Sequence, residues 1–203
     1  MGTTGPSARW LTGTVTSSRR VSSPFPAQLG VADSRNRSYP CDAQRMNDDT
    51  DNPPEPGPIA VLAACDRSVD LPWLRDALEA ALDYVDRPIR SLTVKVVDDA
   101  TMLKLHEHHR GEAITTDVLT FDASDPGGPV DADIVVCADE AARRAAELDH
   151  HLERELLLYA LHGVLHCAGF DDRTPDDFAA MHAEEDRILT AVGIGPTFRG
   201  PTS

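Results

Sequence analysis

The sequence predicts an α/β (α+β) domain in which a small, mixed four-stranded sheet is packed with helices. Apolar residues recur along the chain with two different spacings, and these spacings predict the fold. In short runs such as 92–96, apolar and polar residues alternate, which is the period of a half-buried strand. In longer runs such as 71–84, apolar residues recur three and four apart, which is the period of an amphipathic helix. The runs follow one another as β-α-β-α-β-β-α-α-α without an internal repeat, an order typical of layered folds.

The first four elements have clear local signals. The apolar run 59–62 predicts a buried strand. A stripe of leucines at the first, fourth, eighth and twelfth places of 71–84 predicts a helix. Alternation in 92–96 predicts the second strand. Residues 99–109 are predicted to form the second helix.

The second half of the domain begins with two short strands. The turn 125–129, which holds two prolines and two glycines, separates strand 117–121 from strand 133–137. Three helices complete the domain: 138–148, which is rich in alanine, 152–167, which is the longest, and 178–192. The longest helix carries apolar residues three and four apart.

The segments on either side of the predicted domain, 58–195, differ from it in composition. Residues 1–57 are rich in Ser, Thr, Pro, Gly and Arg, show no sustained period and end in a proline cluster. They are therefore predicted to be a disordered extension. The first 45 residues hold six Arg and two Asp, which makes this extension basic. Residues 196–203 are predicted to be a short tail.

The net charge of −15 argues against a protein that grips nucleic acid over a broad surface, because phosphate contacts need Lys and Arg. An RNA ligand would have to be held by a local basic patch, by a metal or through partner proteins. No apolar run approaches the roughly 18–20 residues of a membrane helix, and no apolar stretch of signal-peptide length stands near the N-terminus. We therefore expect a cytoplasmic protein without membrane contact.

A metal site is predicted at the end of the longest helix. His162 and His166 are four residues apart, so their side chains lie on one face, and both can reach one zinc ion at about 2.0–2.1 Å. Gly169 can take the left-handed conformation that ends a helix and reverses the chain. The reversal could bring Asp172 back towards the metal as a third ligand. Two histidines at this spacing are a weak signal alone, but the glycine and the acid together favour a metal site.

The same spacing underlies the metzincin pattern H-E-x-x-H-x-x-G-x-x-H, which makes this a metzincin-like ligand helix. Gly163, however, stands where those proteases keep the glutamate that activates water. Without that general base the usual route to peptide hydrolysis is missing. A metalloprotease is therefore disfavoured, and a different reaction is expected at a similar ligand frame.

Residues 162–172 run H-G-V-L-H-C-A-G-F-D-D. This stretch resembles the signature of the YbeY family of endoribonucleases, which is H-G-x-L-H-x-x-G-Y-D-H. Phe170 replaces the tyrosine, which is a conservative change. Asp172 replaces the final histidine, which is the most important departure from the family pattern.

The resemblance extends through most of the predicted domain. Residues 110–111 and 116–121 are similar to the family's R-G…T-[DN]-V-L-S-F segment, at the family's spacing. Residues 133–134 resemble its G-D-I strand, and residues 181–189 fit its closing helix. Several ordered motifs at the correct separations over about 58–195 are difficult to obtain by chance.

The resemblance implies a metal-dependent, single-strand-specific endoribonuclease that acts in small-subunit ribosomal RNA maturation and ribosome quality control. It implies one zinc ion held by His162, His166 and Asp172, with His162 and Arg110 in the catalytic machinery. Arg110 would face the cleft and bind the RNA phosphate. Ribosomal RNA, the small ribosomal subunit and ribosomal proteins would be its partners. The alternative is a ribosome assembly factor with a structural metal and little or no cleavage activity, which the acidic charge and the altered third ligand support.

The change from histidine to Asp172 leaves two outcomes open. Asp172 ligates the metal directly, or its shorter reach leaves that place to water or to Asp171. Direct ligation is favoured because mixed His/carboxylate zinc sites are common. His182 could approach the site from the last helix, although its spacing gives no independent support. Thr116 and Asp117 are expected to be structural.

Overall fold

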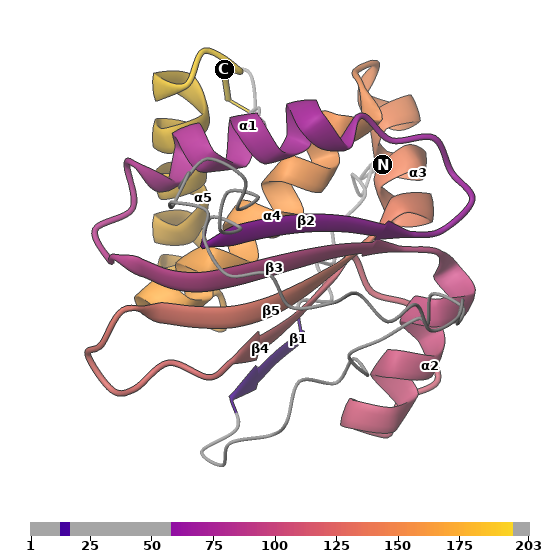
Figure 1. The fold of residues 1–203 in the computed structure, drawn as a ribbon, viewed down its shortest axis with the longest axis horizontal. Helices are drawn as coiled ribbons and strands as arrows, with labels where there is room; N and C mark the ends of the chain where they lie inside the picture. Colours follow the sequence, from indigo (N-terminus) through magenta and orange to yellow (C-terminus); the bar gives the residue numbers. More distant parts are fainter. Residues whose placement is uncertain (1–12, 17–57, 197–203) are drawn as a thin grey trace, which may run out of the picture.

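One mixed sheet forms the centre of the protein, as the computed structural model in Figure 1 shows. The structure describes residues 13–16 and 58–196. The strands of these segments are β1 (Gly13–Thr16), β2 (Ile59–Ala64), β3 (Ile89–Val97), β4 (Val118–Asp122) and β5 (Val130–Cys137). Their order across the sheet is β1-β4-β5-β3-β2. The β4–β5 pair is antiparallel, and the other neighbouring pairs are parallel.

Helices lie on both faces of the sheet (Figure 1). One face is covered by α1 (Leu71–Leu82), α3 (Ala138–Leu148), α4 (Leu152–Ala168) and α5 (Pro175–Ala191). Among these, α4 contacts β4 and β5 and is flanked by the other three. The opposite face carries α2 (Asp99–Arg110). In the described segments, no helix has the length and the apolar character needed to cross a membrane.

The predicted α+β fold with a small mixed sheet is confirmed, since β2 to β5 are its four strands and the five predicted helices are present. Several boundaries shift by up to three residues, and two of these shifts are explained by contacts with other residues. β3 begins at Ile89 rather than at 92, because Ile89 pairs with Val130 of β5. α5 begins at Pro175 rather than at 178, because the Thr174 side chain accepts the backbone N–H of Asp177 and caps the helix.

The short strand β1 lies within the segment 1–57, for which the sequence predicts disorder. It pairs with β4 in parallel, from Gly13 opposite Leu119 to Thr16 opposite Asp122, and so forms one edge of the sheet. The remainder of the predicted extension, and the predicted tail after residue 196, lie outside the described residues.

The two faces of the sheet bury unequal amounts of apolar surface. On β5, the even-numbered residues from Val130 to Val136 face a large core formed with α1, α4 and α5. Val135 and Cys137 face a small core under α2. Each fully buried aliphatic side chain stabilises the fold by about 1.5–3 kcal/mol, so the large core supplies most of the stability. The buried helix α4 is therefore held rigidly against the sheet.

Candidate metal centre

The last two turns of α4 bring the two predicted histidine ligands together. His162 and His166 lie one helical turn apart on the same face, with ring centroids 4.5 Å apart and ring planes at 88°. Their Nε2 atoms approach to 2.9 Å. His162 is buried and His166 is half-buried, so the paired nitrogens lie in a site from which much of the solvent is excluded.

The chain reverses directly after α4, as the glycine predicts. Gly169 has a φ of 104° and its backbone N–H caps the helix by donating to the carbonyl oxygen of His166. The N–H of Phe170 donates to the carbonyl oxygen of Leu165 at 3.0 Å, which completes a glycine-type helix stop. Because the chain turns back here, the Oδ2 atom of Asp172 lies 3.7 Å from Nε2 of His162.

The structure thus brings together all three predicted ligands. One donor atom from each of His162, His166 and Asp172 lies within 4.8 Å of the other two. Ligands at about 2.0–2.1 Å from a tetrahedral zinc ion are separated from one another by about 3.3 Å, and the two separations of 2.9 and 3.7 Å bracket this value. The donor set and its spacing fit a zinc ion.

The other ring nitrogens of the two histidines have acceptor partners, which fixes the tautomers. Nδ1 of His162 donates to Oε1 of Glu185 at 2.6 Å, and Nδ1 of His166 donates to the carbonyl oxygen of Phe170 at 3.1 Å. Neutral rings held in this way direct the lone pairs of their Nε2 atoms at one another across 2.9 Å. Such an arrangement is stable only with a proton or a cation between the nitrogens, which is a second reason why the site fits a metal.

Glu185 on α5 contacts His162, and the sequence did not predict this contact. It is buried to 1% exposure, and its second oxygen accepts from Nδ1 of His182 at 2.5 Å. Met181 and Ile188, four residues before it and three after it, belong to the large core. A carboxylate at such a place in an apolar stripe signals a buried partner. That pattern was visible in the sequence, although the identity of the partner was not.

Charges around the site shift its titrating groups in different directions. Burial lowers the pKa of His162, but the hydrogen bond that its Nδ1 donates to Glu185 and the charges of Glu185 and Asp117 outweigh burial and raise it above its ordinary value. Burial and the charge of His162 lower the pKa of His166. Burial raises the pKa of Glu185, yet its bonds to two imidazoles reverse the shift and lower it. The site therefore favours an ionised carboxylate behind His162.

Asp117 borders the site from the segment that leads into β4. It is buried, and one of its oxygens accepts from the hydroxyl of Thr116 at 3.0 Å and from the N–H of Val118 at 2.8 Å. These bonds agree with the structural role expected for the two residues. Burial raises the pKa of Asp117 to about 6, with the charge of His162 opposing the shift.

Gly163 allows the ligand helix to lie directly on the sheet. A Cβ atom at this position would stand 2.7 Å from Oγ1 of Thr120 and 2.9 Å from Cδ1 of Ile134. Larger side chains are therefore excluded, and the glutamate of a metzincin protease has no room here. The absence of that general base has a packing cause as well as a chemical consequence.

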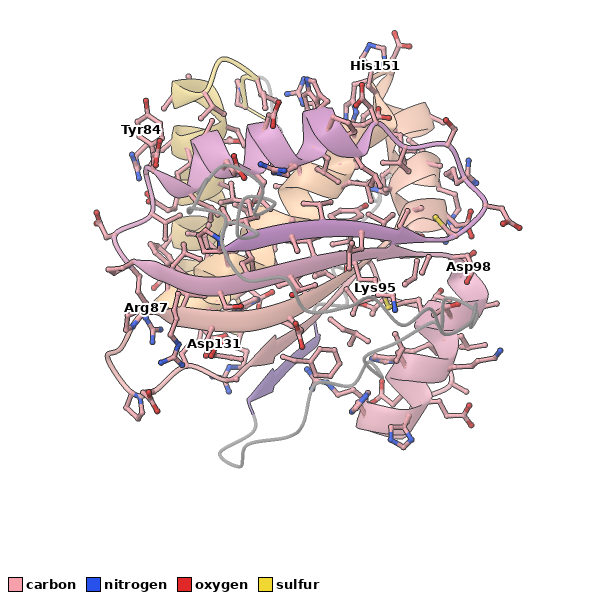
Figure 2. All side chains as sticks on the ribbon, in the orientation of Figure 1. Tyr84, Arg87, Lys95, Asp98, Asp131 and His151 are labelled. Atoms are coloured by element: carbon pink, nitrogen blue, oxygen red, sulfur yellow. The ribbon has the colours of Figure 1, made fainter. Side chains whose placement is uncertain are left out.

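Two arginines have different relations to α4. Arg87, which follows α1, donates to the carbonyl oxygens of Cys167, of Gly128 at 2.6 Å and of Asp125 at 3.2 Å. It thereby ties the end of the ligand helix to the β4–β5 connection, near which its side chain lies in Figure 2. Arg110, the predicted phosphate ligand, ends α2 on the opposite face of the sheet (Figure 1), and its role stays a prediction.

The chain matches one family of known proteins over most of the described domain. The family described as Endoribonuclease YbeY matches residues 66–193. A Symbiobacterium thermophilum protein named Endoribonuclease YbeY is 41% identical over 133 residues, which are 60% of this chain and 85% of that protein. A Roseiflexus protein of the same name is 36% identical over 138 residues, 62% of this chain and 86% of that protein.

A Thermotoga maritima protein with a solved solution structure is 24% identical, with a TM-score of 0.45 over 71% of this chain and 99% of that one. The family match spans the strands and helices from α1 to α5 and includes all three clustered side chains. With two relatives above 30% identity over more than four-fifths of their own length, it shows that the chain belongs to the YbeY family.

Proposed function

We propose that this protein is a zinc-dependent endoribonuclease whose metal is held by His162, His166 and Asp172. The observation that carries the proposal is the convergence of two Nε2 atoms and one carboxylate at the end of α4. Membership of the YbeY family supports it, because the family and the two relatives described above carry the name endoribonuclease.

The residues of the site divide the work between binding and orientation. His162 and His166 present Nε2 to the metal, while their Nδ1 atoms are held by acceptors. Asp172 adds a carboxylate as the third ligand. When bound, the zinc ion supplies Lewis acidity towards a phosphodiester. Outside this cluster, we propose that Arg110 at the end of α2 binds the RNA phosphate, for which its paired N–H groups are suited.

The substrate that we propose is single-stranded RNA of the small ribosomal subunit, met in the cytoplasm during maturation and quality control. The acidic charge of the chain, −15, limits sequence-independent attraction to RNA. We therefore propose that ribosomal proteins on the RNA help to bring the enzyme to its site. This requirement would restrict cleavage to RNA that is presented by a partner.

One observation favours a second candidate function. The third ligand is a carboxylate, and its negative charge reduces the Lewis acidity of the metal relative to a site of three neutral imidazoles. Together with the acidic chain, this supports a ribosome assembly factor in which the metal is structural and cleavage is weak or absent. Metal content and RNA cleavage distinguish the two candidates.

The first test measures zinc by elemental analysis in the wild type and in His162→Ala, Asp172→Ala and the control Asp176→Asn. Asp176 is an exposed acid in the first turn of α5, so its loss should leave the metal in place. About one zinc per chain, absent from both site variants, supports the three-residue site. Zinc retained in Asp172→Ala makes this residue dispensable. No zinc in the folded wild type refutes the site.

The second test measures cleavage of single-stranded RNA by the wild type, Arg110→Ala and the control Arg75→Ala. Arg75 is an exposed arginine of α1 that pairs with Glu79. Loss of cleavage in Arg110→Ala alone, with the zinc content unchanged, supports the endoribonuclease with Arg110 at the phosphate. Zinc binding without any cleavage by the wild type supports the assembly factor.

A further inference from the structure

Glu185 stands between two imidazoles at the junction of α4 and α5. Its Oε1 atom accepts from His162 at 2.6 Å and its Oε2 atom accepts from His182 at 2.5 Å. The side chains of His162 and His182 are 8% and 9% exposed, and that of Glu185 is 1% exposed. Both carboxylate oxygens are therefore occupied within a region that water barely reaches.

The bond to His162 determines which nitrogen of the ring remains available. An ionised carboxylate only accepts hydrogen bonds, so Nδ1 of His162 must carry the proton. The lone pair is then on Nε2, the atom that faces His166 and Asp172. A carboxylate in this position also makes the imidazole a better electron donor to a metal and holds the ring in one orientation.

Packing alone does not account for a glutamate at this place. Its neighbours along α5, Met181 and Ile188, are fully buried in the large core. Apolar residues in place of Glu185 and both imidazoles would fill the same space without the large desolvation cost of a buried carboxylate, and replacing a whole buried ion pair or triad in this way is often neutral or stabilising. A role beyond stability is therefore expected for Glu185.

We propose that Glu185 is a positioning residue for the metal centre, which sets the tautomer and orientation of His162 while His182 holds its second oxygen. The inference rests on the proposed function, because it concerns the same metal site. It deepens that function by making the metal affinity depend on α5, which supplies none of the three ligands. Glu185 is not among the three predicted metal ligands, and its proposed role is to orient one of them.

The test compares the zinc affinity of the wild type with that of Glu185→Gln and of the control Glu184→Gln, by competition with a chromogenic chelator. Glutamine keeps the shape of Glu185 but removes the charge. Glu184 is the adjacent residue on α5, and it pairs with Arg187 at 2.6 Å. We expect zinc affinity to fall by about 10- to 100-fold in Glu185→Gln and to stay at the wild-type value in Glu184→Gln.

A spectroscopic readout separates orientation of the ligand from general damage to the fold. The visible absorption of bound Co²⁺ depends on the geometry and donor strength of its ligands, so the spectrum should change in Glu185→Gln and not in Glu184→Gln. If Glu185→Gln does not fold, the histidine tautomers of the zinc-loaded wild type test the proposal instead. Long-range ¹H–¹⁵N correlation spectra measure these tautomers. Nδ1 of His162 should carry a proton, and ligation through Nδ1 would overturn the proposal.

The outcomes distinguish this inference from the proposed function. Equal zinc affinity and equal Co²⁺ spectra for the wild type and Glu185→Gln would refute the positioning role and leave the metal site intact. Failure of the wild type itself to bind zinc or Co²⁺ would refute the metal site, and this inference with it. Weaker binding only in Glu185→Gln supports both.

Discussion

Each half of α4 is associated with one buried glutamate, but the surroundings of the two carboxyl groups differ. Polar residues recur along one stripe of the helix: Glu155 and Tyr159 in the first half, His162 and His166 in the second. Glu155 itself and Glu185, which packs against the second half, are both 1% exposed. Glu155 pairs with His150, at 2.9 Å, whose side chain is 15% exposed. Glu185 lies between two imidazoles that are more deeply buried.

The pKa values of the two carboxyl groups move in opposite directions as a result. Burial raises the pKa of Glu155, and the charge of His150 opposes the shift without overcoming it. Burial acts in the same sense on Glu185, but hydrogen bonds to His162 and His182 reverse it. The difference teaches that burial alone does not determine the charge of an acid in this core. The number and orientation of its hydrogen-bond partners also determine that charge. The second half of α4, which carries His162 and His166, has the surroundings that favour an ionised carboxylate.

Removal of the better-paired carboxylate should have the largest effect on stability. In metal-free protein, Glu185→Ala leaves two buried imidazoles without their acceptor, and we expect the free energy of unfolding to fall by about 3–5 kcal/mol. Glu155→Ala should lower it less, because the partly exposed His150 can be hydrated. Urea denaturation of both variants measures the difference. Equal losses would show that the two halves do not differ as described.

The next effect concerns the close contact between the second half of α4 and the sheet. An exposed helical glycine replaced by alanine is usually stabilising by up to about 1 kcal/mol. At Gly163, however, the new Cβ would meet Thr120 and Ile134 below 3.0 Å. We therefore expect Gly163→Ala to lower the free energy of unfolding by about 1–3 kcal/mol and to weaken zinc binding. A gain in thermal stability would contradict this close packing.

A pair of arginine variants compares the two ends of the helix. Arg87→Ala removes donors to three carbonyl oxygens, one of them at the end of α4, and should lower the free energy of unfolding by about 1–3 kcal/mol. Arg154, in the first turn, donates to the carbonyl oxygens of Gly195 and Pro196. Arg154→Ala should have a smaller effect, because these acceptors lie near the surface. Thermal unfolding of the two variants measures both losses of stability. A larger loss in Arg154→Ala than in Arg87→Ala would contradict the prediction.

The smallest expected effect is the pH dependence that Glu155 contributes. The pKa of Glu155 in the folded state lies above its ordinary value of 4.5, so the folded state keeps this proton when the unfolded chain has lost it. Stability from this group is therefore full at low pH and declines as the pH rises above about 4.5. In metal-free Glu155→Gln, this decline of the free energy of unfolding with rising pH should be smaller than in the wild type. Identical pH profiles for the wild type and the variant would show that Glu155 ionises as it does in the unfolded chain.

The sequence predicted the parts of this protein that depend on near neighbours in the chain. The four-residue spacing of His162 and His166 places both on one face of any helix, and Gly169 ends that helix because it accepts a positive φ. The apolar periods of residues 58–195 likewise predicted the strands and helices with only small errors at their ends. These features follow from backbone geometry over a few residues.

Only the tertiary structure decided which distant residues meet. The sequence placed Glu185 on the last helix but did not show that it binds His162, since that contact requires α5 to pack beside α4. Nor did it show that Gly163 is needed for contact with β4 and β5, or that residues 13–16 pair with β4. Hydrogen bonds and close contacts of this kind join residues far apart in the chain, and so they depend on how whole elements pack rather than on local sequence.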